Sequence, residues 1–253
     1  MAKTTIDHEV LVRVLTPRPR RIVILTGAGV SAESGVATFR DKGGVWSTVR
    51  IEDVATPQAF ARDPSRVQAF YNGRRRDLGS VEPNAAHRAL AQLQTDFDGE
   101  VMLITQNVDD LHERGGSSAV IHMHGALRSA LCASCGAQVP WEGDLDGSER
   151  CGRCGAVGRL RPDVVWFGEM PYHMEAIEAA LLRADLFVSI GTSGQVYPAA
   201  GFAALAAESG ARTLELNLEP SAGALQFDGC VHAPATQSVR AFVDLLLTPR
   251  HET

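Results

Sequence analysis

Short runs of apolar, mostly β-branched residues alternate along the chain with longer segments of helical pattern. The apolar runs cover Arg21–Thr26, Val101–Thr105, Asp185–Ile190 and Thr213–Asn217. The segments that predict helices are Ser65–Leu78, Asn84–Leu93, His173–Arg183, Pro198–Ser209, Thr236–Leu247 and part of Met1–Pro19. Continuous apolar runs are typical of strands buried on both faces of a sheet. Strands alternating with helices therefore predict an α/β, Rossmann-like fold with a parallel sheet that helices cover on both faces.

The composition excludes several classes of protein. Of the 253 residues, 45% are hydrophobic and 21% charged, as expected for one globular domain or for one large and one small domain. The formal net charge of −6 disfavours nucleic acid as a partner and favours basic ligands such as lysine-bearing protein segments. No apolar run approaches the ~20 residues that span a bilayer, and Met1–Pro19 has no apolar signal core. We therefore expect a cytoplasmic monomer that does not attach to membranes.

Four of the five cysteines form two C-x-x-C pairs, Cys132 with Cys135 and Cys151 with Cys154, and 15 residues separate the pairs. In a protein without an export signal, metal binding is favoured over disulfides. The spacing matches a structural zinc ribbon, in which four thiolates complete the tetrahedron and leave no open position for catalysis. Basic residues between Arg128 and Arg161 are balanced by acidic ones, so the predicted ribbon has no basic face for nucleic acid. We expect the fifth cysteine, Cys230, to be a small buried hydrophobe.

A glycine-rich motif, residues 27–32 (GAGVSA), directly follows the first predicted strand and matches the pattern G-x-G-x-x-A. Such glycines allow a tight turn and a close approach of backbone to a pyrophosphate at a helix N-terminus. Taken alone, the pattern is equally compatible with a turn rich in small residues. A dehydrogenase would also place a ribose-binding acid about 20 residues further on, but Glu52 and Asp53 lie in a loop-like stretch. A hydride-transfer enzyme therefore fits poorly.

Two further polar motifs occur at predicted strand ends. Residues 105–112 (TQNVDDLH) follow a strand, where a parallel sheet binds ligands, although Asn and Asp there are also typical helix caps. Residues 122–125 (HMHG) place two imidazoles on one side of the chain, and histidine suits proton transfer near neutral pH. A structural role is the alternative for these histidines, and His8, His87 and His251 carry no local signal.

Together the motifs resemble one family, the sirtuins, which are NAD-dependent protein deacylases. The resemblance rests on GAGVSAESGVATFRD (27–41), TQNVDDLH, HMHG, the two C-x-x-C pairs, RPDVVWFGE (161–169), GTSGQVYP (191–198) and LNLEP (216–220). It runs in order from Arg21 to Leu247, nearly the whole chain. Ala37 stands where many sirtuins have proline, which loosens the loop but removes no reacting group.

The resemblance implies NAD as co-substrate, one structural zinc ion and acylated-lysine proteins as substrates. The implied NAD-binding residues are Gly27, Ala28, Gly29, Ser31, Ala32, Glu33, Phe39, Arg40, Trp46, Gln106, Asn107, Val108, Asp109, Gly191, Thr192, Ser193, Asn217, Leu218, Glu219 and Ala235. Asn107 would orient the ribose, Asp109 would hold the carboxamide and His124 would act as general base. The implied partners of the substrate backbone, by β-augmentation, are Val164, Val165, Trp166 and Phe167.

The implied reaction begins when the acyl oxygen attacks the anomeric carbon of the ribose and expels nicotinamide. His124 then deprotonates a ribose hydroxyl, which attacks the resulting imidate, and water releases free lysine and O-acyl-ADP-ribose. A mono-ADP-ribosyltransferase would use the same NAD site and is the main alternative. A non-catalytic NAD-sensing or DNA-binding module gives no role to Asn107, Asp109 and His124 together.

The acyl preference depends on Tyr71 and Arg74, which share one face of a predicted helix. They resemble the Tyr-x-x-Arg signature of class III sirtuins, which remove succinyl and malonyl groups, and bacterial members also accept acetyl-lysine. A guanidinium and a phenol can bind a distal carboxylate through charge-assisted hydrogen bonds. Without the resemblance, residues 74–76 (RRR) would be interpreted as a solvated basic run.

These observations predict an interrupted Rossmann-like domain. We expect it to comprise residues 1–41, 87–128 and 161–253. A helical insertion at 42–86 would carry the acyl-pocket residues, and a small zinc-binding domain would occupy 129–160, where Cys, Gly and Ser replace large apolar residues.

Overall fold

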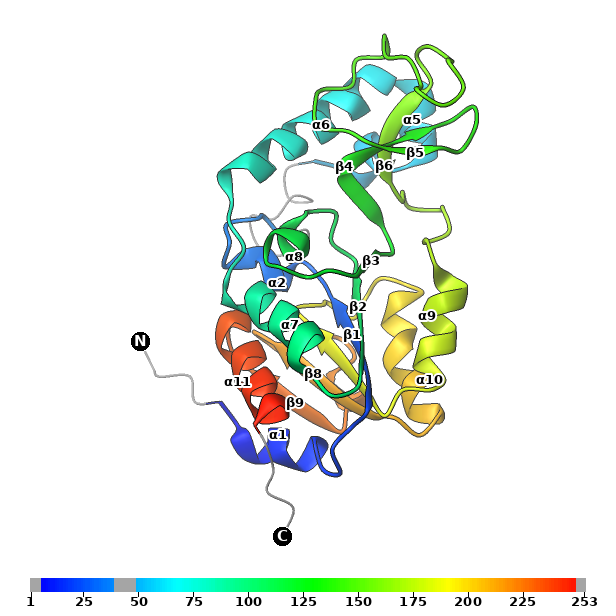
Figure 1. Ribbon diagram of the computed structural model, residues 1–253. Coiled ribbons are helices and arrows are strands. Elements are labelled where there is room, and N and C mark those ends of the chain that lie inside the picture. Colours follow the sequence, from blue (N-terminus) through cyan, green and yellow to red (C-terminus); the bar gives the residue numbers. More distant parts are fainter. Residues whose placement is uncertain (1–5, 39–48, 249–253) are drawn as a thin grey trace.

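The computed structural model describes residues 6–38 and 49–248, and its centre is a six-stranded parallel sheet (Figure 1). The strands are β1 (Arg21–Thr26), β2 (Glu100–Thr105), β3 (Val120–His122), β7 (Leu186–Ile190), β8 (Arg212–Asn217) and β9 (Gly229–His232). Their order is β3-β2-β1-β7-β8-β9. From β1 the chain adds β2 and β3 toward one edge of the sheet, and then β7, β8 and β9 toward the other edge, so the switch point lies between β1 and β7. In open parallel sheets, ligands bind beyond the carboxyl ends of the strands at such a switch point.

Helices cover both faces of this sheet. One face is covered by α1 (His8–Val14), α7 (Ala85–Asp96) and α11 (Ala235–Leu247), the other by α9 (Met174–Leu181) and α10 (Phe202–Glu208). Strand β1 contributes Ile22 and Ile24 to the first core and Val23 and Leu25 to the second, as alternation along a strand requires. The predicted α/β fold with a doubly covered parallel sheet is therefore confirmed.

The predicted elements differ from the observed ones mainly at two places. The segment predicted as one helix, 198–209, is divided into a 3-10 turn, η2 (Ala199–Gly201), and α10, with Gly201 at the junction. Glycine is a poor residue for a helix interior, which accounts for the division. The strand end expected at the HMHG motif is β3, which stops at His122, whereas the short strand β9 has no continuous apolar run and was not expected from the sequence.

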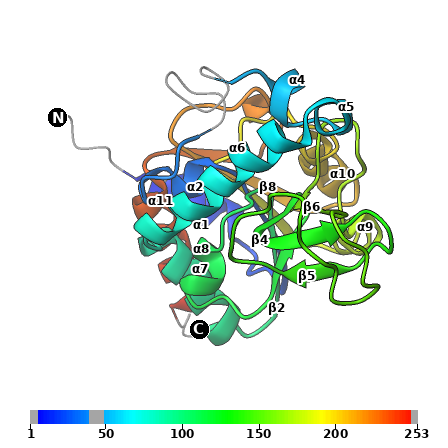
Figure 2. The same ribbon diagram turned by 90° about the horizontal axis from the view of Figure 1, so that it is seen from above.

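A smaller part of the molecule lies beyond the carboxyl ends of the parallel strands (Figures 1 and 2). It contains an antiparallel sheet of order β5-β4-β6, formed by β4 (Gly125–Cys132), β5 (Gln138–Pro140) and β6 (Leu160–Val164). Beside it lie α4 (Ile51–Val54), α5 (Pro57–Arg62) and α6 (Pro64–Asp77), which ends in η1 (Leu78–Ser80). The remaining short helices are α2 (Gly29–Ala32), α8 (Leu111–Arg114) and η3 (Ala224–Gln226). None of the described helices is both long and apolar enough to cross a membrane.

Helix α6 is fastened to the smaller sheet by buried polar groups. Asn72 donates to the carbonyl of Leu145 at 2.8 Å and accepts from its N–H at 2.9 Å. Arg75 donates from Nε to the carbonyl of Leu127 at 2.6 Å and from Nη1 to Asn72 Oδ1 at 2.9 Å. Because both side chains are buried, breaking these bonds would leave uncompensated polar groups. The position of α6 therefore depends on the fold of its neighbour.

Candidate active site

The loops after β1 and β7 touch through glycines. A Cβ atom on Gly27 would lie 2.8 Å from the carbonyl oxygen of Gly191, and one on Gly29 would lie 2.7 Å from the Cα of Gly191. Gly191 has φ +62°, and a Cβ atom on it would lie 2.5 Å from the backbone N of Val30. All three positions therefore require glycine for loop–loop packing. The loops after β1 and β7, which lie on opposite sides of the switch point, therefore pack directly against each other. Together they are called the rim below.

Ser31 joins the glycine-rich loop to the loop after β2. Its hydroxyl donates to Asp109 Oδ2 at 3.1 Å and accepts from Asn107 Nδ2 at 3.2 Å. His87 Nε2 lies 3.3 Å away, and His87 Nδ1 accepts from the N–H of Asn84, so Nε2 carries the proton and donates to Ser31. A hydroxyl has one donor and two acceptor positions, and protein groups occupy all three here. The Ser31 side chain thus orients Asn107 and Asp109.

Asn107 is held at three points. Besides its bond to Ser31, its N–H donates to Thr105 Oγ1 at 3.0 Å and its carbonyl oxygen lies 3.2 Å from His122 Nδ1. Thr105 Oγ1 also accepts from Thr26 Oγ1, which lies 2.9 Å from His112 Nε2. Asn107 is only 3% exposed. These contacts fix the conformation of the loop.

The two histidines of the HMHG motif have different protonation states. His124 Nδ1 lies 3.2 Å from the carbonyl oxygen of Gln106, which can only accept, so Nδ1 carries a proton and Nε2 has a free lone pair. Burial lowers the pKa of His124, against the effect of the Gln106 hydrogen bond, so the ring is neutral near pH 7. His122 contacts two acceptors, Asn107 O and Glu113 Oε1 at 2.7 Å, so both of its nitrogens donate. Burial lowers its pKa, but the Glu113 carboxylate more than offsets this, and the pKa is raised.

A cavity of about 220 Å³ lies next to this loop. Its lining residues come from the glycine-rich loop, the α6–η1 segment, the loop after β2 and β4: Ala28, Gly35, Val36, Ala37, Arg74, Asp77, Leu78, Ser80, Val81, Asn107, Val108, Asp109 and Leu127. Burial raises the pKa of Asp109, although hydrogen bonds from the Leu111 N–H and Ser31 oppose the shift. Burial lowers the pKa of Arg74, while the charges of Tyr71, Asp77 and Asp109 oppose this. Arg74 and Asp109 thus line one cavity, and burial disfavours the charged form of each.

Tyr71 lies on α6 one turn before Arg74 but is not among the residues that line this cavity. Its hydroxyl oxygen accepts from Trp166 Nε1 at 3.1 Å, and the two rings lie 6.4 Å apart. Burial raises the pKa of Tyr71 well above its usual value, so the phenol keeps its proton. The three consecutive arginines diverge: Arg75 is buried against backbone carbonyls, and Arg76 forms an exposed ion pair with Asp144. The alternative of a solvated basic run is wrong for Arg74 and Arg75.

The segment expected to pair with substrate is irregular after its first residue. Strand β6 ends at Val164, and the following three N–H groups donate within the chain, to His124 O, Glu169 Oε2 and Ala55 O. The N–H groups of residues 165–167 are therefore engaged within the chain, so a peptide that paired here would have to donate to carbonyl groups of this segment. The Trp166 side chain is 3% exposed and packs under the Arg161 guanidinium at 4.0 Å, whereas Phe167 is 41% exposed. Of these two rings, Phe167 is the one that can touch a partner.

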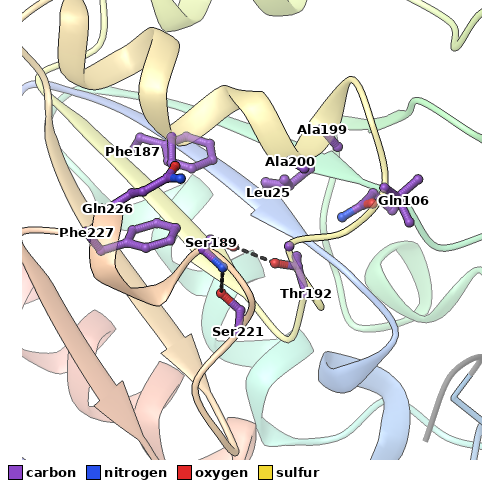
Figure 3. A pocket seen from close by; sticks show the side chains of 14 residues that line it. Leu25, Gln106, Phe187, Ser189, Thr192, Ala199, Ala200, Ser221, Gln226 and Phe227 are labelled. Atoms are coloured by element: carbon purple, nitrogen blue, oxygen red, sulfur yellow. Dashed lines mark hydrogen bonds between the residues drawn. The ribbon is translucent and has the colours of Figure 1, made fainter.

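The loops after β7 and β8 are tied together on the other side of the switch point. Asn217 Nδ2 donates to the carbonyl of Thr192 at 2.8 Å, and Ser193 O accepts from the Ala222 N–H at 3.2 Å. Leu218 is 66% exposed, and Glu219 is also exposed. A second cavity, of about 20 Å³, fits one water molecule. In Figure 3, Phe187 and Phe227 lie on one side of it and Gln106 on the opposite side, with Ser189 and Thr192 hydrogen bonded at 2.8 Å.

Glu33 faces a helix rather than a cavity. Its carboxylate accepts from the N–H and the hydroxyl of Thr236, both at 2.9 Å, at the start of α11 beside Ala235. An acid at a helix N-terminus is stabilising because it satisfies free N–H groups. The remaining predicted contacts Phe39, Arg40 and Trp46 lie outside the described residues.

The four paired cysteines converge as the spacing predicts. Cys132 Sγ lies 3.7 Å from Cys154 Sγ, Cys135 Sγ lies 3.9 Å from Cys151 Sγ, and all four sulfur atoms are within 4.8 Å of one another. Zinc–thiolate bonds of about 2.3 Å in a tetrahedron put sulfur atoms about 3.8 Å apart. The donor set therefore fits one zinc ion, with all four coordination positions filled by protein.

The arrangement of the sheet, the glycine contacts and the four cysteines has counterparts in known proteins. Residues 27–198 match the model of the Sir2 family. The chain belongs to the Sir2 family. A Caulobacter vibrioides protein named NAD-dependent protein deacylase is 56% identical over 90% of this chain and 97% of its own length. An Escherichia coli K12 protein of the same name is 53% identical over 90% of this chain and 82% of its own length. A crystal structure of a Sir2 homologue in complex with NAD has a TM-score of 0.85 and 38% identity, covering 97% of this chain and 96% of that one.

Two features of this sirtuin's site were not expected from the sequence. His87, for which no local signal was recognised, is fully buried, completes the capping box of α7 with Asn84 and donates to Ser31. The spacing Asn84-x-x-His87 is the available signal, since a capping box joins the N-cap and the third helical residue. His112 is also buried, and burial is the main cause that lowers its pKa. These two neutral histidines support the loop that carries Asn107.

Proposed function

We propose that this sirtuin is an NAD-dependent protein deacylase that removes succinyl and malonyl groups, and also acetyl groups, from protein lysine side chains. The observation that carries the acyl preference is the position of Arg74. Its side chain lines the same cavity as Asn107 and Asp109, on a helix whose place is fixed by buried contacts. A cation at this cavity suits an acyl group that ends in a carboxylate.

The proposed NAD site extends across the switch point. Gly27, Ala28, Gly29, Ala32 and the Gly191–Ser193 loop would contact the phosphates and the adenosine side, together with the segment 217–219 and Ala235. Gln106, Asn107, Val108 and Asp109 would form the nicotinamide and ribose pocket, with Ser31 as the residue that positions Asn107 and Asp109. The contacts among Gly27, Gly29 and Gly191 support this assignment because they bring both halves of the rim together.

His124 would act as the general base. Its Nε2 has a free lone pair, and its ring is neutral near pH 7, so it can accept a proton from a ribose hydroxyl of bound NAD. The charged ring of His122 cannot do so while it donates to Glu113. Asn107 would orient the ribose and Asp109 would bind the carboxamide of nicotinamide. Phe167, whose ring is exposed, would contact the substrate protein.

Replacing Arg74 with methionine tests the acyl preference. A charge-assisted hydrogen bond contributes about 1.5–3 kcal/mol, so kcat/KM for desuccinylation should fall about 10- to 100-fold, with a much smaller loss for deacetylation. The measurement is a panel of lysine peptides that differ only in the acyl group, read by mass spectrometry. Arg76→Met is the matched control, because Arg76 is exposed and paired with Asp144. Equal losses of desuccinylation and deacetylation would contradict the assignment of Arg74 to the acyl pocket. They would not contradict the proposal that the protein is a deacylase.

The pH dependence of kcat/KM tests the base. His124 is active when neutral, and burial places its pKa below the ordinary value of 6.5. Activity should therefore be level from neutral pH down to about 6.5 and fall tenfold per pH unit below the His124 pKa. If kcat/KM falls to half its maximum at a pH above 6.5, a different group titrates.

A further inference from the structure

Three side chains with metal-ligating atoms converge on β8 and β9, away from the four-cysteine cluster. Glu215 on β8 is the register partner of Cys230 on β9, and His232 follows Cys230 by two residues on the same face. Their ligand atoms lie within 4.8 Å of one another. Cys230 is half-buried beside an acid and an imidazole, so its expected role as a buried hydrophobe is wrong.

The carboxylate of Glu215, one of these three groups, has a buried oxygen without a hydrogen-bond partner among the described residues. Glu215 is 1% exposed. Its Oε1 accepts from the Ser221 N–H at 3.2 Å and lies 3.3 Å from His232 Nε2, whereas its Oε2 has no partner among the described residues. Burying a carboxylate oxygen without a donor or a cation is costly. A bound cation would compensate for that cost.

The donor set selects the kind of cation. A carboxylate oxygen, an imidazole nitrogen and a thiolate together favour Zn²⁺ and similar divalent ions, because Mg²⁺ and Ca²⁺ prefer oxygen ligands alone. Adjacent ligands of a tetrahedral zinc lie about 3.5 Å apart, so side-chain shifts of about 1 Å bring these three atoms onto one ion. The His232 side chain is 34% exposed, which leaves a path for entry and room for water as fourth ligand.

We propose that Glu215, Cys230 and His232 form a second metal site for Zn²⁺ or a similar divalent transition-metal ion. Glu215 Oε2 and Cys230 Sγ ligate from inside, and His232 Nε2 ligates from the solvent side. Oε1 of Glu215 keeps its bond from the Ser221 N–H. The site has three protein ligands and an open position, so it binds its ion more weakly and exchanges it faster than the four-thiolate site.

Addition of Co²⁺ to the zinc-loaded full chain tests this proposal, with the zinc content measured by elemental analysis throughout. The expected result is one Co²⁺ per chain, no loss of zinc, and a near-ultraviolet thiolate-to-cobalt absorption band. Cys230→Ala should abolish the band, and His232→Ala and Glu215→Gln should each weaken Co²⁺ binding more than about tenfold. His8→Ala, an exposed histidine on α1, is the matched control and should bind as the wild type does.

Three results would overturn the proposal. The first is that the amount of Co²⁺ bound does not exceed the amount of zinc released. The second is that Co²⁺ binds without a thiolate band, and the third is that Cys230→Ala and His232→Ala bind Co²⁺ as the wild type does. Glu215→Gln retains the shape of the side chain and its acceptor for the Ser221 N–H, so the test does not depend on a variant that unfolds. Circular dichroism of each variant confirms that the fold is retained.

Discussion

Replacing His124 with alanine should lower kcat for deacylation by about 10²- to 10⁴-fold, the usual contribution of a general base. The physical reason is the tautomer fixed by the Gln106 carbonyl, which leaves His124 Nε2 as an acceptor. The imidazole is only half-buried, and the hydrogen bond of its Nδ1 is to a backbone carbonyl. Its removal should therefore leave the melting temperature and the zinc content unchanged.

The measurement follows nicotinamide release and deacylated peptide separately by mass spectrometry. Adenine-labelled NAD then distinguishes deacylation from mono-ADP-ribosyl transfer, because only transfer leaves label on the acceptor protein. His173→Asn is the matched control: this exposed histidine has φ 60°, a left-handed conformation that asparagine tolerates. If His124→Ala keeps full deacylase activity, His124 has no part in the reaction.

The fold could be predicted because its strongest sequence signal is local. Residues 22–26 of β1 (IVILT) are buried on both sides of the sheet, so each of them must be apolar or able to bond internally. Strand β3 lies at the sheet edge with all three residues half-buried. Strand β9, the other edge, contains a glycine and an exposed histidine. Edge strands of this kind lack the apolar continuity on which the prediction depends.

The candidate site was only partly predictable because some of its contacts join distant residues. Asn107, Asp109 and His124 belong to contiguous motifs at strand ends, where the topology of a parallel sheet gathers ligand-binding groups. The bond from His87 to Ser31 spans 56 residues, and the bond from Asn72 to Leu145 spans 73. No local pattern specifies such partners. The contact of Glu33 is equally non-local, since its carboxylate accepts from Thr236 at the start of α11, 203 residues away.

Removal of the structural zinc should affect the acyl pocket as well as the ribbon. The buried cluster of the small sheet consists of Ala130, Cys132, Ala137, Leu145, Cys151 and Leu160, so two of its members are metal ligands. A core this small is not expected to fold without the ion, because binding free energies of about 10 kcal/mol belong to the folding of such domains. Leu145 also holds Asn72 of α6 through two hydrogen bonds. Loss of the ribbon therefore releases the helix that carries Arg74.

The variant Cys151→Ala should lose its zinc, expose α6 to amide hydrogen exchange over residues 64–77, and lower kcat/KM for succinyl-lysine peptides more than tenfold. Cys230→Ser is the matched control, because Cys230 lies outside the four-thiolate cluster and should leave its zinc in place. Exchange in β1 and β7 should change little, since the parallel sheet has its own cores on both faces. Unchanged protection of α6 in zinc-free Cys151→Ala would show that Asn72 and Arg75 hold the helix without the ribbon, and that the acyl pocket does not depend on the metal.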